Sequence, residues 1–91
     1  MEKGEEKAYD DWVENYKKAS EEILDDLRYK TYYSNAWNAL NGFYRCLKAH
    51  RLKLAKMDVA DRVDFYFIGG VYAESTESAY RRFISKVLER I

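Results

Sequence analysis

Apolar and polar positions alternate along most of this chain with the three- and four-residue spacing of an α-helix. The longest such stretch is residues 5–30, where six apolar side chains fall on one stripe: Tyr9, Trp12, Tyr16, Ala19, Ile23 and Leu27. Charged side chains occupy the opposite side. The pattern predicts an amphipathic helix, with Thr31 or Ser34 as the expected N-cap of the helix that follows.

A second helix is expected over residues 34–56. Its apolar line consists of Ala36, Leu40, Phe43, Leu47, His50 and Leu54, and Tyr33, Trp37 and Tyr44 widen it on one side. At 100° per residue a polar set falls on the far side: Asn35, Asn38, Asn41, Arg45, Lys48, Lys53 and Lys56. Gly42 lies on that side too, and its missing side chain leaves room for another group to approach closely.

A third, shorter helix is expected after Asp58, which is suited to cap it, with Asp61 close to the positive end of the helix dipole. Glycines 69 and 70 are expected to end it. Residues 63–68 are also rich in β-forming side chains, so a short strand is the alternative. We favour the helix because the sequence shows no partner strand.

A last helix is expected to follow a loop at residues 71–74, with Ser75 or Thr76 as its cap, and to run to the end of the chain. Its inner face is predicted to be Ala79, Tyr80, Phe83, Val87, Leu88 and Ile91. Together the patterns predict an all-α, compact four-helix bundle-like domain, built as a long helical hairpin plus two shorter helices.

The composition fits a single globular domain spanning residues 1–91. The chain is 47% hydrophobic and 16% aromatic, with nine tyrosines and no proline, which excludes a disordered tail. We see no internal repeat and no linker-like tract. Glutamine is absent while Lys and Glu are abundant, which is a trend of thermophilic proteins.

Cys46 is the sole cysteine, so an internal disulfide is excluded and a reducing compartment is expected. No apolar run is long enough to cross a membrane, and the charged start does not resemble a signal peptide. We therefore expect a cytoplasmic protein without a membrane partner.

The net charge is zero but unevenly distributed. Residues 1–30 carry ten acidic and six basic side chains, whereas residues 31–57 carry five basic and no acidic ones. Lys, Arg and Asn contact phosphates and bases, so a nucleic-acid or partner-binding face is predicted at Asn38, Asn41, Arg45, Lys48, Lys53 and Lys56. The alternatives are a solvated face, or one balanced by the acidic first helix or by another chain. The zero net charge favours these over a dedicated DNA-binding domain.

The last two helices permit a helix-turn-helix interpretation, in which Ser75, Ser78, Arg81 and Arg82 contact nucleic acid. However, the turn from Gly70 to Ser75 is longer than that motif uses. An ordinary helical hairpin is the alternative, and we favour it.

The segment Arg45-Cys46-Leu47-Lys48-Ala49-His50 has an R-x4-H spacing that resembles the ribonuclease motif of HEPN helical domains. The resemblance covers six residues and implies that Arg45 and His50 would handle a scissile phosphate. In that family the residue after the arginine is usually polar, whereas here it is Cys46. The alternative, which we favour, is that His50 is a partly buried histidine bonded to a backbone group or a tyrosine.

Other catalytic or metal chemistry has little support in the sequence. His50 is the sole histidine, and its pairing with Cys46 at i, i+4 lacks a third orienting group. Asp58, Asp61 and Asp64 do not follow a calcium-loop pattern. Since no phosphate loop or CxxC motif is present either, we expect no cofactor, no metal and no enzyme activity.

Five aromatic side chains cluster where the first two helices meet: Tyr29, Tyr32, Tyr33, Trp37 and Tyr44. Surface Tyr and Trp are typical of protein-binding hot spots, but they also stack on unpaired bases or form the rim of a core. Our leading hypothesis is a non-catalytic interaction module, either an accessory subunit of a larger complex, nucleic-acid-handling complexes included, or a homo-oligomer. A helix-turn-helix-like nucleic-acid-binding regulator is the alternative, and a HEPN-like ribonuclease ranks third.

Overall fold

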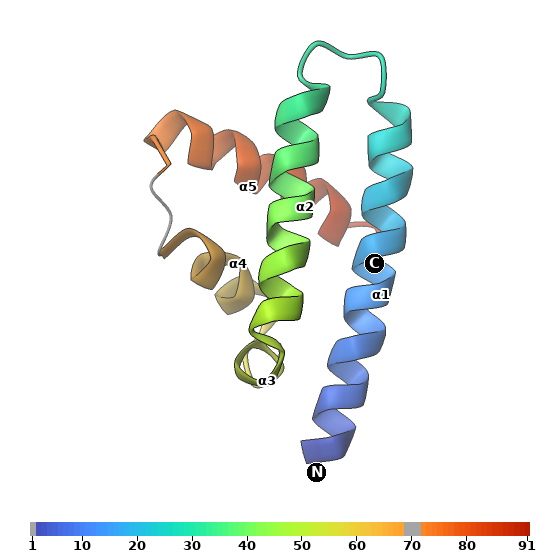
Figure 1. Cartoon of the computed structure of the whole chain (residues 1–91), viewed down its shortest axis with the longest axis vertical. Helices are drawn as coiled ribbons and strands as arrows, with labels where there is room; N and C mark the ends of the chain where they lie inside the picture. Colours follow the sequence, from blue (N-terminus) through green and yellow to red (C-terminus); the bar gives the residue numbers. More distant parts are fainter. Residues whose placement is uncertain (1, 69–71) are drawn as a thin grey trace.

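The computed structural model describes residues 2–68 and 72–91, and all regular structure within these ranges is helical. The helices are α1 (Glu2–Asp26), α2 (Tyr33–Ala49), α3 (Arg51–Leu54), α4 (Val59–Ile68) and α5 (Glu74–Leu88). In Figure 1, α1 and α2 run antiparallel side by side, while α5 crosses behind them and α4 lies next to α2, to its left in this view. The predicted all-α fold and the long hairpin are confirmed.

The contact between α1 and α2 is built from tyrosines. Tyr9 and Tyr16 are buried, and their hydroxyls donate hydrogen bonds of 2.7 Å to the carbonyl oxygens of Leu47 and Leu40. The Tyr16 ring also meets the edge of Phe43 at a centroid distance of 5.3 Å. Because a buried hydroxyl without a partner is costly, these bonds fix the register of the hairpin.

Helix α1 ends at Asp26, four residues before the predicted boundary. The chain then passes through successive turns, in which Lys30 N–H donates to Leu27 O and Tyr33 N–H donates to Lys30 O. Residues 28–30 are exposed, so no buried apolar side chain continues the stripe that stabilises the helix. The predicted N-cap at Thr31 or Ser34 is wrong, since Tyr32 occupies the cap position without a side-chain hydrogen bond.

The expected unbroken helix over residues 34–56 is divided at His50, whose backbone leaves the helical conformation. The break turns Leu54 into the core and brings Arg51 against α1. His50 itself is exposed, and its ring packs edge-to-face with Phe65 at a centroid distance of 5.0 Å. Its predicted place on the buried apolar line is therefore wrong.

Helix α4 confirms a helix rather than a strand over residues 63–68. Asp58 acts as the predicted cap, because its Oδ1 accepts a 2.9 Å hydrogen bond from Asp61 N–H. The predicted stop at glycines 69 and 70 lies outside the described residues.

Helix α5 begins at Glu74, with Ala73 in the cap position, so the predicted Ser75 or Thr76 cap is wrong. Its buried residues are Tyr80, Ile84 and Val87, and the inner face predicted from the sequence did not include Ile84. Ile91, predicted to face inward, is exposed because the helix ends at Leu88.

Gly42 lets α4 approach α2. A Cβ atom at this position would clash with the hydroxyl of Tyr66. That hydroxyl lies 3.2 Å from the Tyr72 hydroxyl, and the Tyr66 ring packs on Phe43 and Phe67, so it has little room to yield. The close approach that the sequence suggested at Gly42 is therefore made within the chain.

We expect Gly42→Ala to lower the free energy of unfolding by about 1–2 kcal/mol, because the cost of overpacking exceeds the helix preference of Ala over Gly. In a Tyr66→Phe background, which removes the clashing oxygen, the loss should shrink or change sign. Urea unfolding of the four proteins measures this. Gly4→Ala is the control, since no heavy atom lies within 4 Å of a Cβ atom there. Equal losses in both backgrounds would exclude the Tyr66 clash as the cause.

Candidate functional site

Two hollows lie one after the other along the helical hairpin between α1 and α2, and no residue of α4 or α5 lines either of them. The first has a volume of about 400 Å³ and is lined chiefly by Lys17, Glu21, Leu24, Asp25 and Arg28 of α1 and its end, with Tyr33, Trp37, Asn41 and Tyr44 of α2. The second, of about 350 Å³, is lined by residues that include Asp10, Glu14, Lys48 and Arg51. We call the two hollows together the α1–α2 groove.

The predicted aromatic cluster is only partly brought together. Tyr33, Trp37 and Tyr44 line the α1–α2 groove, where 40% of Trp37 is exposed and Lys17 Nζ lies 5.5 Å from the Tyr44 ring centroid. Tyr32 instead stacks on Phe83 of α5. Tyr29 is 89% exposed, with the Arg28 guanidinium 5.2 Å from its ring centroid.

The predicted polar face of the second helix divides at the break. Asn38, Arg45 and Lys48 are exposed on α2, while Asn41 lines the groove and donates from Nδ2 to the Trp37 carbonyl. Lys53 and Lys56 lie beyond His50, on α3 and the turn after it, so they do not continue the stripe of α2. Lys53 Nζ lies 5.1 Å from the Phe65 ring centroid.

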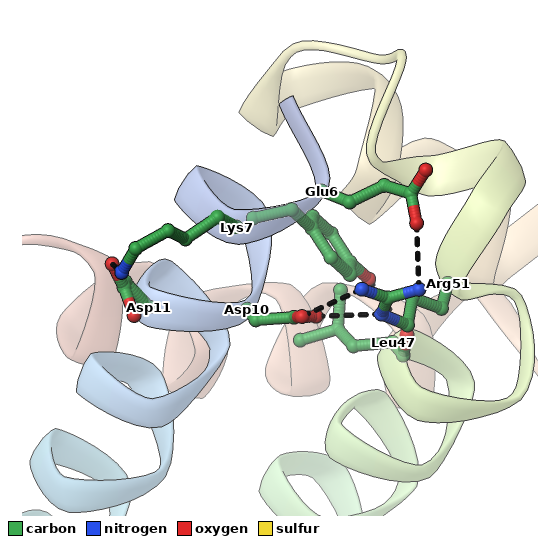
Figure 2. A network of polar contacts seen from close by, with 7 residues as sticks. Glu6, Lys7, Asp10, Asp11, Leu47 and Arg51 are labelled. Atoms are coloured by element: carbon green, nitrogen blue, oxygen red, sulfur yellow. Dashed lines mark hydrogen bonds and ion pairs between the residues drawn. The ribbon is translucent and has the colours of Figure 1, made fainter. Parts of the chain in front are cut away.

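Arg51 is the ionic centre of the hairpin, and sequence reasoning gave it no role. Its Nε and Nη2 donate to the two carboxylate oxygens of Asp10 at 2.7 Å each, and its Nη1 donates to Glu6 at 2.9 Å (Figure 2). Hydrogen bonding to Arg51 holds the pKa of Asp10 below its ordinary value. The signal that could have found this pair was an acid-free segment lying antiparallel to an acidic helix.

Arg81 and Arg82 have different surroundings. Arg81 donates to Glu77 at 2.8 Å and to Asp64 at 2.9 Å, and its guanidinium lies 4.6 Å from the Phe67 ring centroid. Arg82 is exposed. The start of α5 also carries two acidic residues, Glu74 and Glu77. Both features weigh against α5 as a helix that contacts phosphates.

The candidate catalytic residues do not form a recognisable site. Arg45 and His50 are exposed, and His50 packs on Phe65. Burial raises the pKa of the Cys46 thiol, which disfavours the thiolate needed for nucleophilic attack. Among the described residues, no three His, Cys, Asp or Glu side chains are grouped to hold a metal ion.

Comparison with protein-family models, with curated proteins and with solved structures yields no match for this chain. In the part of the chain that the structure describes, no helix has the length and apolar character needed to cross a membrane.

The pairing of Asp10 with Arg51 predicts a pH-dependent contribution to stability. Since Asp10 has a lowered pKa in the folded protein, its carboxylate stabilises the fold above the unfolded pKa of about 3.9, and this contribution is lost as the pH falls through the lower folded pKa. The wild type should therefore be more stable than Asp10→Asn at about pH 7, and the difference should close below about pH 4.

Urea unfolding at several pH values measures this difference. Asp11→Asn is the matched control, because Asp11 pairs with Lys7 through two largely exposed side chains and should contribute little. If Asp10→Asn and Asp11→Asn gave the same pH profile, the Arg51 pairing would not be the source of the effect.

Proposed function

We propose that this protein is a non-catalytic interaction module of the cytoplasm, either an accessory subunit of a larger assembly or a homo-oligomer, that binds a polypeptide in the α1–α2 groove. The observation that carries this proposal is the aromatic lining of the groove, in which Trp37 is exposed and Tyr33 and Tyr44 are half-buried. A partly exposed Trp beside two Tyr is the composition of a binding hot spot.

The geometry supports this function in two ways. The three aromatic side chains project from one helix, α2, which the buried Tyr9 and Tyr16 bonds hold against α1, so they lose little freedom when a partner binds. A groove between two antiparallel helices also accepts a third helix, which is a common mode of polypeptide recognition.

The local chemistry favours binding over catalysis. Cys46 has a raised pKa, and His50 packs on Phe65 with no orienting partner hydrogen-bonded to it among the described residues. A general base or nucleophile normally needs such a partner. The ribonuclease interpretation of Arg45 and His50 therefore has no support beyond the spacing of the two residues.

Nucleic acid remains the second candidate partner, on a specific observation. Arg45 and Lys48 are exposed on α2, and in residues 2–68 and 72–91 neither lies within ion-pair distance of a carboxylate. The zero net charge and the acidic start of α5 weigh against this candidate.

Trp37→Glu tests the proposal, because it places a charge in the centre of the groove. A tagged chain is introduced into native cells that hold the untagged chain, and the retained polypeptides are quantified by mass spectrometry. With Trp37→Glu, we expect the retained amount of at least one polypeptide, either another protein or the untagged copy, to fall by at least about tenfold. Leu52→Glu is the control, since Leu52 is 63% exposed on α3 and does not line this groove.

A purified partner should then shift the fluorescence of Trp37 to shorter wavelength in a Trp12→Phe background, where Trp37 is the sole tryptophan. If wild type, Trp37→Glu and Leu52→Glu retain the same polypeptides in equal amounts, the groove is not a binding surface.

Binding to labelled single- and double-stranded DNA and RNA across a salt series tests the second candidate. Phosphate contacts give an affinity that falls steeply with salt. If binding at low salt is lost in Arg45→Glu with Lys48→Glu but survives in Trp37→Glu, nucleic acid is the partner of α2. The absence of binding even at low salt would eliminate this candidate.

A further inference from the structure

The two walls of the α1–α2 groove differ in charge. The α1 wall has four carboxylates, Asp10, Glu14, Glu21 and Asp25, against two cations. Asp10 is paired with Arg51 and Asp25 with Arg28, so Glu14 and Glu21 are the two without an ion-pair partner among the described residues. The α2 wall has no carboxylate, because none occurs between residues 31 and 57, and it carries Lys48, with Arg45 beside it on the exposed side. An occupant that matches this groove must present cations toward α1 and anions toward α2.

A second copy of this chain meets that requirement. We propose that two copies pack face to face through their α1–α2 grooves, with α1 of each against α2 of the other. Rotation by 180° about an axis parallel to the helices exchanges the two walls, so the acidic α1 of one copy lies over the basic α2 of its partner. This inference rests on the proposed function and names the occupant of the groove.

The same rotation keeps each residue at its height along the groove. Residues at one end of the groove in one copy therefore face residues at the same end in the other copy. Glu14 and Lys48 line the same hollow, the one that includes Arg51, so in the proposed dimer they form two equivalent pairs across the axis. Among the described residues neither lies within ion-pair distance of an opposite charge, and Lys48 acts on Asp10 of its own chain only from farther away, where it helps to lower the pKa of that carboxyl.

Other arrangements of two copies match less well. Rotation about an axis perpendicular to the helices would place α1 on α1 and α2 on α2, which opposes like charges. The opposite face of the hairpin is already covered, because α5 packs against both α1 and α2.

Charge reversal tests the pairing between copies. Glu14→Lys alone and Lys48→Glu alone each oppose like charges at both pairs, so each variant should weaken the dimer by at least about tenfold. An equimolar mixture of the two variants should restore it, because each heterodimer then contains two pairs of opposite charge. Recovery of a dimer on mixing would come from contact between copies, because mixing leaves the charges within each chain unchanged.

Sedimentation across a range of concentrations measures the association, and a mass tag on one variant identifies the heterodimer. Asp11→Lys and Arg82→Glu are the controls, since they make the same charge changes at exposed residues outside the groove and should leave the dimer unaffected. A wild type that is monomeric into the millimolar range, or a mixture that stays monomeric, overturns the inference. If the wild type is monomeric but Trp37→Glu loses a different polypeptide, the proposed function stands and only the second copy is excluded.

Discussion

Two hydrogen bonds from tyrosine hydroxyls on α1 to carbonyl oxygens on α2 determine how the rest of the molecule is arranged. Each contributes about 0.5–1.5 kcal/mol to the stability of the fold. Burial raises the pKa of Tyr9 to about 12 and that of Tyr16 further, so both hydroxyls remain protonated donors at physiological pH. Since helical carbonyls recur at fixed heights, bonding to Leu47 and Leu40 permits one register of α1 on α2.

That register determines which side chains meet elsewhere. It brings Asp10 opposite Arg51, so the ion pairs and the buried tyrosines support the same alignment. It also places Tyr33, Trp37 and Tyr44 along the open edge of the contact rather than inside it. The exposed aromatic groove is thus a consequence of how the hairpin is locked, with α5 covering the other face.

The sequence was sufficient for features that depend on local spacing. The apolar stripes of α1 and α2 follow from periodicity, and the Asp58 cap follows from capping chemistry. The helix over residues 63–68 is favoured because the sequence shows no partner strand, and the structure has it. The sequence was insufficient for features that depend on contacts between residues far apart along the chain. The break at His50 coincides with the pairing of Arg51 and the burial of Leu54, which are tertiary contacts that no local pattern reports. Arg81 was missed as a structural residue for the same reason, since Asp64 lies on another helix.

The stability of the fold does not account for the uneven distribution of charge along the chain. Of the five basic residues between 31 and 57, Arg51 pairs with a carboxylate among the described residues, and the other four are not needed for such pairs. Exposed charges contribute little to folding, so stability does not explain why α2 lacks carboxylates altogether. Charge on a binding face chiefly selects orientation and speeds encounter, whereas buried aromatic area supplies affinity. The groove combines both elements: in the proposed complex its charged walls set the direction of the occupant, and Trp37 with its two tyrosine neighbours supplies the aromatic contact area.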